Sequence, residues 1–106
     1  MNRDNIHCYV SGYIKEHGVT AHMWISLPLT DVECNVLELL IKGYTVSQIS
    51  KFRCRSDKTV SAQKYQIYTK LGIRNDITFW LDLLFSSSVK IRFTNNKAKT
   101  GVLSSL

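Results

Sequence analysis

The chain has 106 residues, of which 44% are hydrophobic, with one proline and five glycines. This length and composition fit one folded domain and exclude both a low-complexity chain and a sensor domain joined to a DNA-binding domain. The formal net charge of +6 indicates an anionic partner, and because the chain has neither a bilayer-spanning apolar run nor a signal peptide's apolar core, we expect a soluble, cytoplasmic protein.

Residues 4–16 are predicted to form an N-terminal helix, because their apolar residues recur at helical spacing. The expected apolar stripe consists of Ile6, Tyr9, Val10, Tyr13 and Ile14. Gly18 is placed to end this helix, which would either dock on the rest of the module or pair with a second subunit. Residues 19–28 show no clear period and lead into Pro28, so we expect a connector packed on the core.

The three cysteines, Cys8, Cys34 and Cys54, are odd in number and widely spaced. This arrangement favours free thiols over a disulfide framework. A metal site built from Cys8, His17 and His22 is conceivable, but the spacing of these residues matches no zinc pattern. We therefore expect no metal site and no cofactor.

A helix is predicted from about residue 31 to residue 42. Thr30 and Glu33 form a capping box that marks its start. Lys42 and Gly43 supply a C-terminal cation and a residue that tolerates the left-handed cap. Its buried face is expected to contain Val32, Val36, Leu37, Leu39, Leu40 and Ile41.

Two further helices are predicted with a short turn between them. Thr45 can cap the first, in which Val46, Ile49 and Phe52 are expected to face inward. Residues 53–55 form the turn, and Ser56 caps the second, which Gly72 ends. The inward positions of that helix are Val60, Ile67 and Leu71. A short helix, a turn and a capped second helix match a helix-turn-helix.

Positive charge is concentrated in this region. Residues 42–74 hold eight basic residues and one acid, Asp57. This concentration of positive charge favours contact with nucleic acid. The alternative is a solvated basic face without a partner.

A fourth helix is predicted from Asn75 or Asp76 to about Phe85, and most of its faces are apolar. A small core needs only one apolar face, so the second requires a partner. We expect Ile77, Trp80, Leu81 and Leu84 to form a dimer contact. The alternative is that the N-terminal helix covers this face.

Residues 86–106 are predicted to form a basic, flexible tail. Val89, Ile91 and Phe93 alternate with Lys90 and Arg92, so a short strand or an extended arm is expected there. The tail's four cations, unaccompanied by an acid, would add unspecific attraction to phosphates or merely keep the end soluble.

Caps, apolar residues and glycines stand at fixed spacing along the predicted helices: Leu29 to Glu33, Val36, Leu37, Leu39, Leu40, Gly43, Gln48, Ile49, Lys58 to Val60, Ile67 and Lys70 to Gly72. Together these positions resemble the LuxR/GerE-type helix-turn-helix family of bacterial transcription regulators. The resemblance covers residue 29 to about residue 85, and the form of residues 58–64 is most similar to the Rcs and Fim-type branch.

This resemblance implies an all-α fold class: a four-helix LuxR-type module, here with the additional N-terminal helix and with no other domain. Its third helix would enter the major groove and its fourth would form the dimer contact. The domains are then 1–28, 29–85 and 86–106. Cys54 stands in the turn where the family has an aliphatic residue, so we interpret its thiol as a packing group.

On a helical wheel, one face of the third helix is opposite its buried positions. Three of its residues are candidates for contact with base edges: Ser61, Ala62 and Tyr65. Lys58 and Thr59 at the start of this helix, together with Ser47 near the start of the second helix, are placed for phosphates. Gln63, Lys64 and Lys70 flank the groove face and would reach the backbone on either side. Surface packing is the alternative for Tyr65 and the preferred interpretation for Tyr68.

We therefore expect a DNA-binding transcription regulator, nucleoid-associated when bound, whose partners are double-stranded DNA and a second subunit of the same or another LuxR-type protein. The alternative is a protein-interaction modulator that heterodimerises with a full-length LuxR-type regulator and alters its DNA binding. An enzyme is not expected, since no catalytic set surrounds His7, His17 or His22 and no glycine-rich phosphate loop exists.

Overall fold

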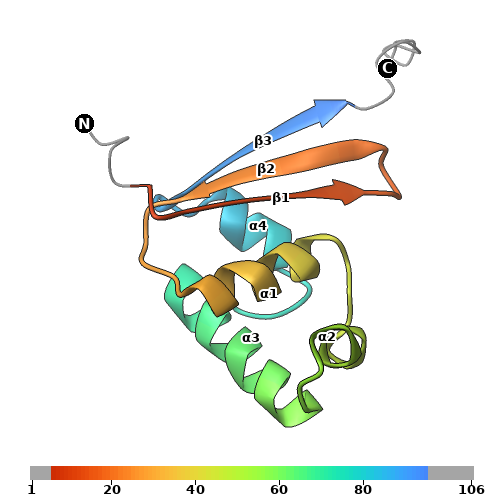
Figure 1. Ribbon diagram of the computed structural model, residues 1–106. Helices are drawn as coiled ribbons and strands as arrows, with labels where there is room; N and C mark the ends of the chain where they lie inside the picture. The colour runs from red at the N-terminus through yellow and green to blue at the C-terminus, as the bar shows by residue number, and fades with distance from the viewer. Residues whose placement is uncertain (1–5, 96–106) are drawn as a thin grey trace.

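The structure, a computed structural model, describes residues 6–95, which form a three-stranded antiparallel sheet and four helices (Figure 1). In chain order the elements are β1 (Cys8–Ile14), β2 (Val19–Ile25), α1 (Asp31–Ile41), α2 (Val46–Arg53), α3 (Asp57–Leu71), α4 (Phe79–Leu84) and β3 (Val89–Asn95). Helix α1 lies between the sheet and α3, so the sheet and α3 form opposite sides of the molecule (Figure 1).

The all-α fold class is wrong, because the fold is mixed α/β. The predicted N-terminal helix is strand β1, and the predicted connector is strand β2. The predicted helical stripe includes Tyr9 and Tyr13, yet both are exposed, while the alternate residues Cys8, Val10 and Gly12 are buried. The true period is two, which suits the aromatic and β-branched composition of the segment.

A tight turn joins β1 to β2 at the position where a helix end was expected. Gly18 has a φ of 64° and its amide donates to the carbonyl of Ile14 at 2.9 Å. This left-handed conformation is one that glycine adopts without steric cost. The same property that would end a helix here closes a hairpin.

Strand β3 completes the sheet from the far end of the described chain. The strand order is β1-β2-β3, and the register places Val10 opposite Met23 and Met23 opposite Ile91. The strand that was one of two expectations for residues 89–93 is therefore present. The rest of the predicted tail, residues 96–106, and residues 1–5 lie outside the described residues.

The main core lies between the inner face of the sheet and the helices. Its fully buried side chains include Met23, Ile25, Leu37, Ile67 and Leu83, which come from β2, α1, α3 and α4. Burying side chains of this size contributes about 1.5–3 kcal/mol each. The core thus fixes the sheet, α1 and α3 as one unit.

Gly12 allows β1 to approach the end of α1 closely. A Cβ atom at this position would lie 2.8 Å from Cγ of Lys42 and 3.2 Å from Cγ1 of Ile41.

Helix α1 begins with the predicted capping box, in which Thr30 Oγ1 accepts from the Glu33 amide at 3.1 Å and Glu33 Oε1 accepts from the Thr30 amide at 2.9 Å. The predicted bounds of this helix are confirmed to within a residue.

Cys8 and Cys34 form a disulfide between β1 and α1, so the prediction of free thiols is wrong for these two. Packing of β1 on α1 brings their Cα atoms to 6.6 Å although they are 26 residues apart. Sequence spacing alone does not reveal that proximity. Cys54 is free.

Two findings concern the described residues only. No helix in residues 6–95 has the length and apolar character needed to cross a membrane. Within the same range no three metal-binding side chains gather, and Cys8, from the metal site considered above, is held in the disulfide.

Candidate nucleic-acid interface

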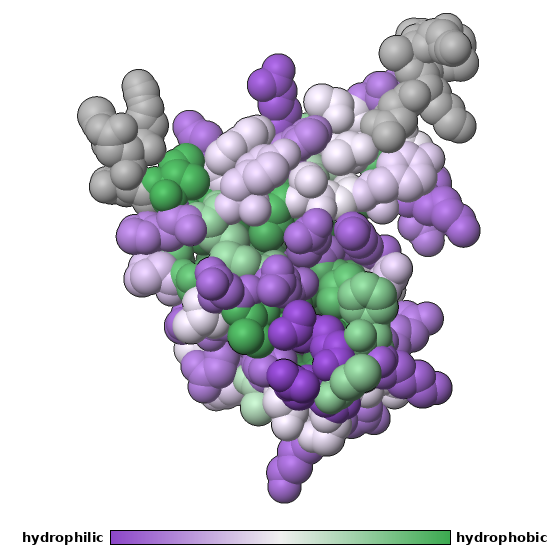
Figure 2. Space-filling view, viewed as in Figure 1, coloured by the Kyte–Doolittle hydropathy of each residue, from purple (hydrophilic) through white to green (hydrophobic). Residues whose placement is uncertain are grey.

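Helix α2 begins with a second capping box. Thr45 Oγ1 accepts from the Gln48 amide at 3.2 Å, and Gln48 Oε1 accepts from the Thr45 amide at 2.9 Å. Ile49 is buried as expected, but Phe52, expected to face inward, is 69% exposed. Positions three apart rotate by about 60° at each step on an α-helix, so Phe52 turns away from the core. Figure 2 shows hydrophobic side chains reaching the surface over α2.

The turn between α2 and α3 carries an exposed cysteine. Cys54 has a φ of 56°, in the left-handed region, and its side chain is exposed. The interpretation of Cys54 as a packing group is therefore wrong. The left-handed residue ends α2 and allows the Arg55 amide to donate to the Ser50 carbonyl at 2.9 Å, which turns the chain into α3.

Helix α3 starts and ends where the sequence predicts. Ser56 Oγ accepts from the Thr59 amide at 3.1 Å, and Gly72 ends the helix with a φ of 73°. The predicted inward positions, Val60, Ile67 and Leu71, are all buried. One side of α3 thus belongs to the core and the other faces solvent.

Asp57 couples α2 to α3. Its carboxylate accepts from the hydroxyl of Ser50, which is 7% exposed, and lies 3.5 Å from the hydroxyl of Ser47. The single acid of the basic stretch is therefore bound to α2. This contact fixes the angle between the two helices.

The solvent side of α3 contains most of the predicted DNA-contact residues. The exposed ones are Lys58, Thr59, Ser61, Ala62, Tyr65 and Lys70, and Ser47 on α2 is exposed as well. Gln63 and Lys64 are half-buried. The described terminal segments lie in the sheet, on the other side of α1 (Figure 1), so they leave the Lys58 and Ser61 side of α3 open.

Two of the lysines expected to reach the DNA backbone form ion pairs within the protein. Lys64 Nζ lies 3.0 Å from Asp76 Oδ1, and Lys70 Nζ lies 2.7 Å from Glu33 Oε1. Burial alone raises the pKa of Glu33, but its hydrogen bonds with Lys70 and Thr30 outweigh burial and hold the pKa below its usual value. The structure therefore does not present these two lysines as free cations.

Pairing divides the eight basic residues of the stretch into two groups. Four of them form ion pairs with carboxylates: Lys42, Lys64, Lys70 and Arg74. The other four have no ion-pair partner among residues 6–95, and we call them the basic cluster: Lys51, Arg53, Arg55 and Lys58. The basic cluster occupies the end of α2, the turn and the start of α3.

Sequence reasoning named only Lys58 from the basic cluster. Lys51, Arg53 and Arg55 were counted in the charge total but not assigned to a site. The positive end of a helix dipole and the free amides at the start of α3 lie beside the cluster, and both attract anions. The cations without an ion-pair partner therefore gather around the α2–α3 turn.

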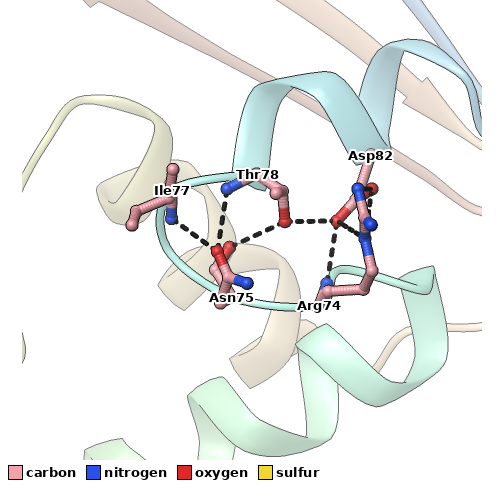
Figure 3. Close-up of polar contacts among 5 residues, drawn as sticks. All are labelled: Arg74, Asn75, Ile77, Thr78 and Asp82. Carbon is pink, nitrogen blue, oxygen red and sulfur yellow. Dashed lines mark hydrogen bonds and ion pairs between the residues drawn. The ribbon is translucent and has the colours of Figure 1, made fainter.

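A polar network rigidifies the corner between α3 and α4 (Figure 3). Asn75 Oδ1 accepts from the amides of Ile77 and Thr78 at 2.9 and 3.0 Å, and Asp82 accepts from the Thr78 hydroxyl at 2.6 Å. Arg74 donates to Asp82 from both its backbone and its guanidinium. Helix α4 begins at Phe79, later than expected, because Asn75 shapes this corner instead of opening the helix.

Helix α4 exposes an apolar surface on the side away from the core. Phe79 and Leu83 are buried, whereas Leu81 is 50% and Leu84 52% exposed, and Ile77, in the corner before the helix, is 94% exposed. Trp80, also predicted to be in a dimer contact, is half-buried, with its ring centroid 5.9 Å from that of Phe93 on β3. Three of the four predicted contact residues thus remain on the surface.

Comparison with known proteins finds relatives of the helical region that contains this site. Residues 27–79 match the model of the family described as bacterial regulatory proteins, luxR family. The chain is 40% identical over 84 residues to the cyclic di-GMP phosphodiesterase PdeL of Escherichia coli strain K12, which is 79% of this chain and 23% of PdeL.

Two regulators are also similar. The uncharacterized HTH-type transcriptional regulator YuaB of Escherichia coli strain K12 is 49% identical over 55 residues, 52% of this chain and 16% of YuaB. The transcriptional regulatory protein RcsB of Salmonella typhimurium is 39% identical over 69 residues, 65% of this chain and 31% of RcsB. The chain thus spans less than a third of each relative. No solved structure matches it.

Proposed function

The chain belongs to the luxR family of bacterial regulatory proteins, and on that premise we propose that it is a DNA-binding transcription regulator that inserts α3 into the major groove. Helix α3 offers an exposed polar side that begins at a hydroxyl cap. The width of the major groove admits such a helix. The enzymatic name of PdeL describes that protein, and we assign no catalysis to this chain.

The basic cluster is the observation that carries the proposal. Its four cations have no carboxylate partner in residues 6–95 and come from the end of α2, the turn and the first turn of α3. Neutralising four phosphates corresponds to a slope of about −3.6 in a plot of log affinity against log salt. This sequence-independent attraction would bring α3 to the duplex and hold it there.

Base recognition is assigned to Ser61, Ala62 and Tyr65. Their side chains offer single hydroxyl hydrogen bonds and a methyl group that fits the thymine methyl. None is a bidentate reader, so discrimination by one module would be modest. Ser47 and Thr59 complete the phosphate contacts, and Gln63, Lys64 and Lys70 flank them. To donate to phosphates, the Ser47 hydroxyl would have to leave Asp57, and Lys64 and Lys70 would have to leave Asp76 and Glu33.

Dimerisation through α4 would supply the missing discrimination by reading two half-sites. The exposed Ile77, Leu81 and Leu84 form the proposed contact, since apolar side chains left in water by the monomer favour association. The same surface also suits a heterodimer with another LuxR-type regulator.

Mobility-shift titrations at two salt concentrations test the proposed phosphate contact. Lys58→Ala should weaken binding to every duplex and reduce the salt slope by about 0.9. Ala62→Gln should instead change the ranking of duplex sites, because glutamine can bind adenine bidentately. Lys15→Ala is the matched control, since it removes the same charge from the exposed hairpin between β1 and β2.

Two results would count against this assignment. If Lys15→Ala and Lys58→Ala changed the slope equally, only net charge would matter. If the protein formed no specific complex until another LuxR-type regulator was added, the alternative function, a heterodimerising modulator, would be favoured.

A further inference from the structure

The outer face of the sheet is rich in aromatic and basic side chains. Alternation along the strands places one set of residues against the helices and the other set on this face. The outward set consists of Tyr9, Ser11, Tyr13, Thr20, His22, Trp24, Lys90, Arg92 and Thr94. The face points away from α1 and α3 (Figure 1), so a duplex bound at α3 would leave it free.

Hydrogen bonds hold two rings of this face, those of Tyr9 and His22, in place. Tyr9 Oη lies 2.8 Å from His22 Nδ1, and His22 Nε2 lies 3.0 Å from Thr94 Oγ1. This chain of contacts crosses all three strands and uses both imidazole nitrogens. The rings therefore have a fixed arrangement before any ligand arrives, which lowers the entropy cost of binding.

The rings of Tyr9, His22 and Trp24 lie close together, and two of their three pairs are nearly parallel. The His22 and Trp24 planes differ by 22° with centroids 6.2 Å apart, and the Tyr9 and His22 planes differ by 19° at 6.3 Å. The Tyr9 and Trp24 centroids are 5.3 Å apart, with their planes tilted by 40°, and Tyr9 is 50% exposed. A cluster of aromatic rings at a protein surface is the kind of platform on which flat partners stack.

Two cations border the rings on β3. Lys90 is paired in register with Trp24, and Arg92 with His22. Both are exposed, and neither has an ion-pair partner among residues 6–95. The nine outward residues include no acid. The positive charge of this face therefore favours an anionic ligand.

We propose that the outer face of the sheet binds single-stranded DNA, with bases stacked on Tyr9 and Trp24 and phosphates held by Lys90 and Arg92. Aromatic platforms beside a positive track are the general means of binding single strands, since every base has a π-face. A duplex cannot use the rings, because its base faces are stacked inside the helix. This site is separate from the α3 interface and goes beyond the proposed regulator function.

A second copy of the chain fits this face less well. Two copies packed face to face would bury four cations with no carboxylate on either surface to pair with them. Unpaired buried charge is strongly unfavourable. Charge complementarity therefore selects a polyanion over self-association.

Fluorescence anisotropy with a labelled oligothymidine of about 12 nucleotides tests the proposal. Trp24→Leu should weaken oligothymidine binding about tenfold through lost stacking. The double variant Lys90→Gln/Arg92→Gln, which leaves the core untouched, should reduce the salt slope by about 1.4. Both proteins should bind duplex DNA as the wild type does. Lys58→Ala is the crossed control and should weaken duplex binding without changing oligothymidine binding.

Several outcomes would overturn the proposal. Failure of the wild type to bind oligothymidine is one, and equal binding by the wild type and the Lys90→Gln/Arg92→Gln variant is another. Loss of oligothymidine binding in Lys58→Ala would locate the strand at α3. Binding of oligouridine without oligothymidine would identify RNA as the occupant, and a dimer abolished by Trp24→Leu would make the face a self-interface.

Discussion

Asp82 is the most heavily bonded carboxylate in residues 6–95. It accepts from the Thr78 hydroxyl, from the Arg74 backbone amide at 2.8 Å and from the Arg74 guanidinium at 3.0 Å, as Figure 3 shows. These bonds, led by those from the Arg74 side chain, lower the pKa of Asp82 to about 2. The ionised form is therefore part of the folded corner between α3 and α4.

Substitution of Asp82 should expose this dependence on pH. A carboxylate with a depressed pKa stabilises the fold above its ordinary pKa of 3.8, and that contribution is lost as the pH falls toward 2. Asp82→Asn should therefore unfold at lower urea concentration than the wild type at pH 7, and the difference should shrink in acid.

Urea denaturation from neutral to acidic pH measures this effect. Asp31→Asn serves as the matched control, because Asp31 is an exposed carboxylate in the first turn of α1. The account of Asp82 is wrong if Asp82→Asn and the wild type share one unfolding midpoint throughout the range.

Individual caps could be predicted from the sequence, whereas individual charge states could not. Thr30, Thr45 and Ser56 act within three residues of their partners, so local order reveals them. Lys70 finds Glu33 37 residues away. Which lysines remain free for phosphate is thus a tertiary property, and the basic cluster emerges only when the paired cations have been set aside.

The bounds of α1 and α3 follow from caps and apolar spacing, but the strands do not. Strand β1 contains exposed aromatic residues that imitate a helical stripe, and β2 depends on β3, whose partner residues lie about 70 positions away in the register Ala21 to Phe93. Long-range pairing of this kind decides between helix and strand wherever local propensity is weak. The all-α prediction was wrong because local sequence patterns do not reveal this long-range strand pairing.

The exposed side of α4 should mediate self-association. Leu81→Gln removes one half-exposed apolar side chain from each subunit, and losing about 1.5 kcal/mol per copy corresponds to a dimer weaker by about a hundredfold. Sedimentation equilibrium measures this change. Since Leu81 is outside the buried core, the variant should still fold.

Val32→Gln provides the matched control for α4. Val32 is an apolar residue on α1 that is 37% exposed, and its substitution should leave association unchanged. A wild type that stays monomeric at every concentration, or equal weakening by the two variants, would show that α4 is not the contact.

The whole molecule has two chemically different sides. Helix α3 and the basic cluster form one side, the sheet forms the other, and α1 separates them (Figure 1). The disulfide between Cys8 and Cys34 and the shared core join the two sides. Binding at either side therefore requires no opening of the fold, and the two proposed contacts can be tested independently.

Nuclear magnetic resonance of the isotope-labelled protein titrated with duplex DNA tests the central claim most directly. The account predicts that the largest backbone amide shifts fall on residues 51–65, at the α2–α3 turn and the exposed side of α3. Shifts that centre on the sheet or on α4 and leave residues 58–65 unperturbed would contradict it.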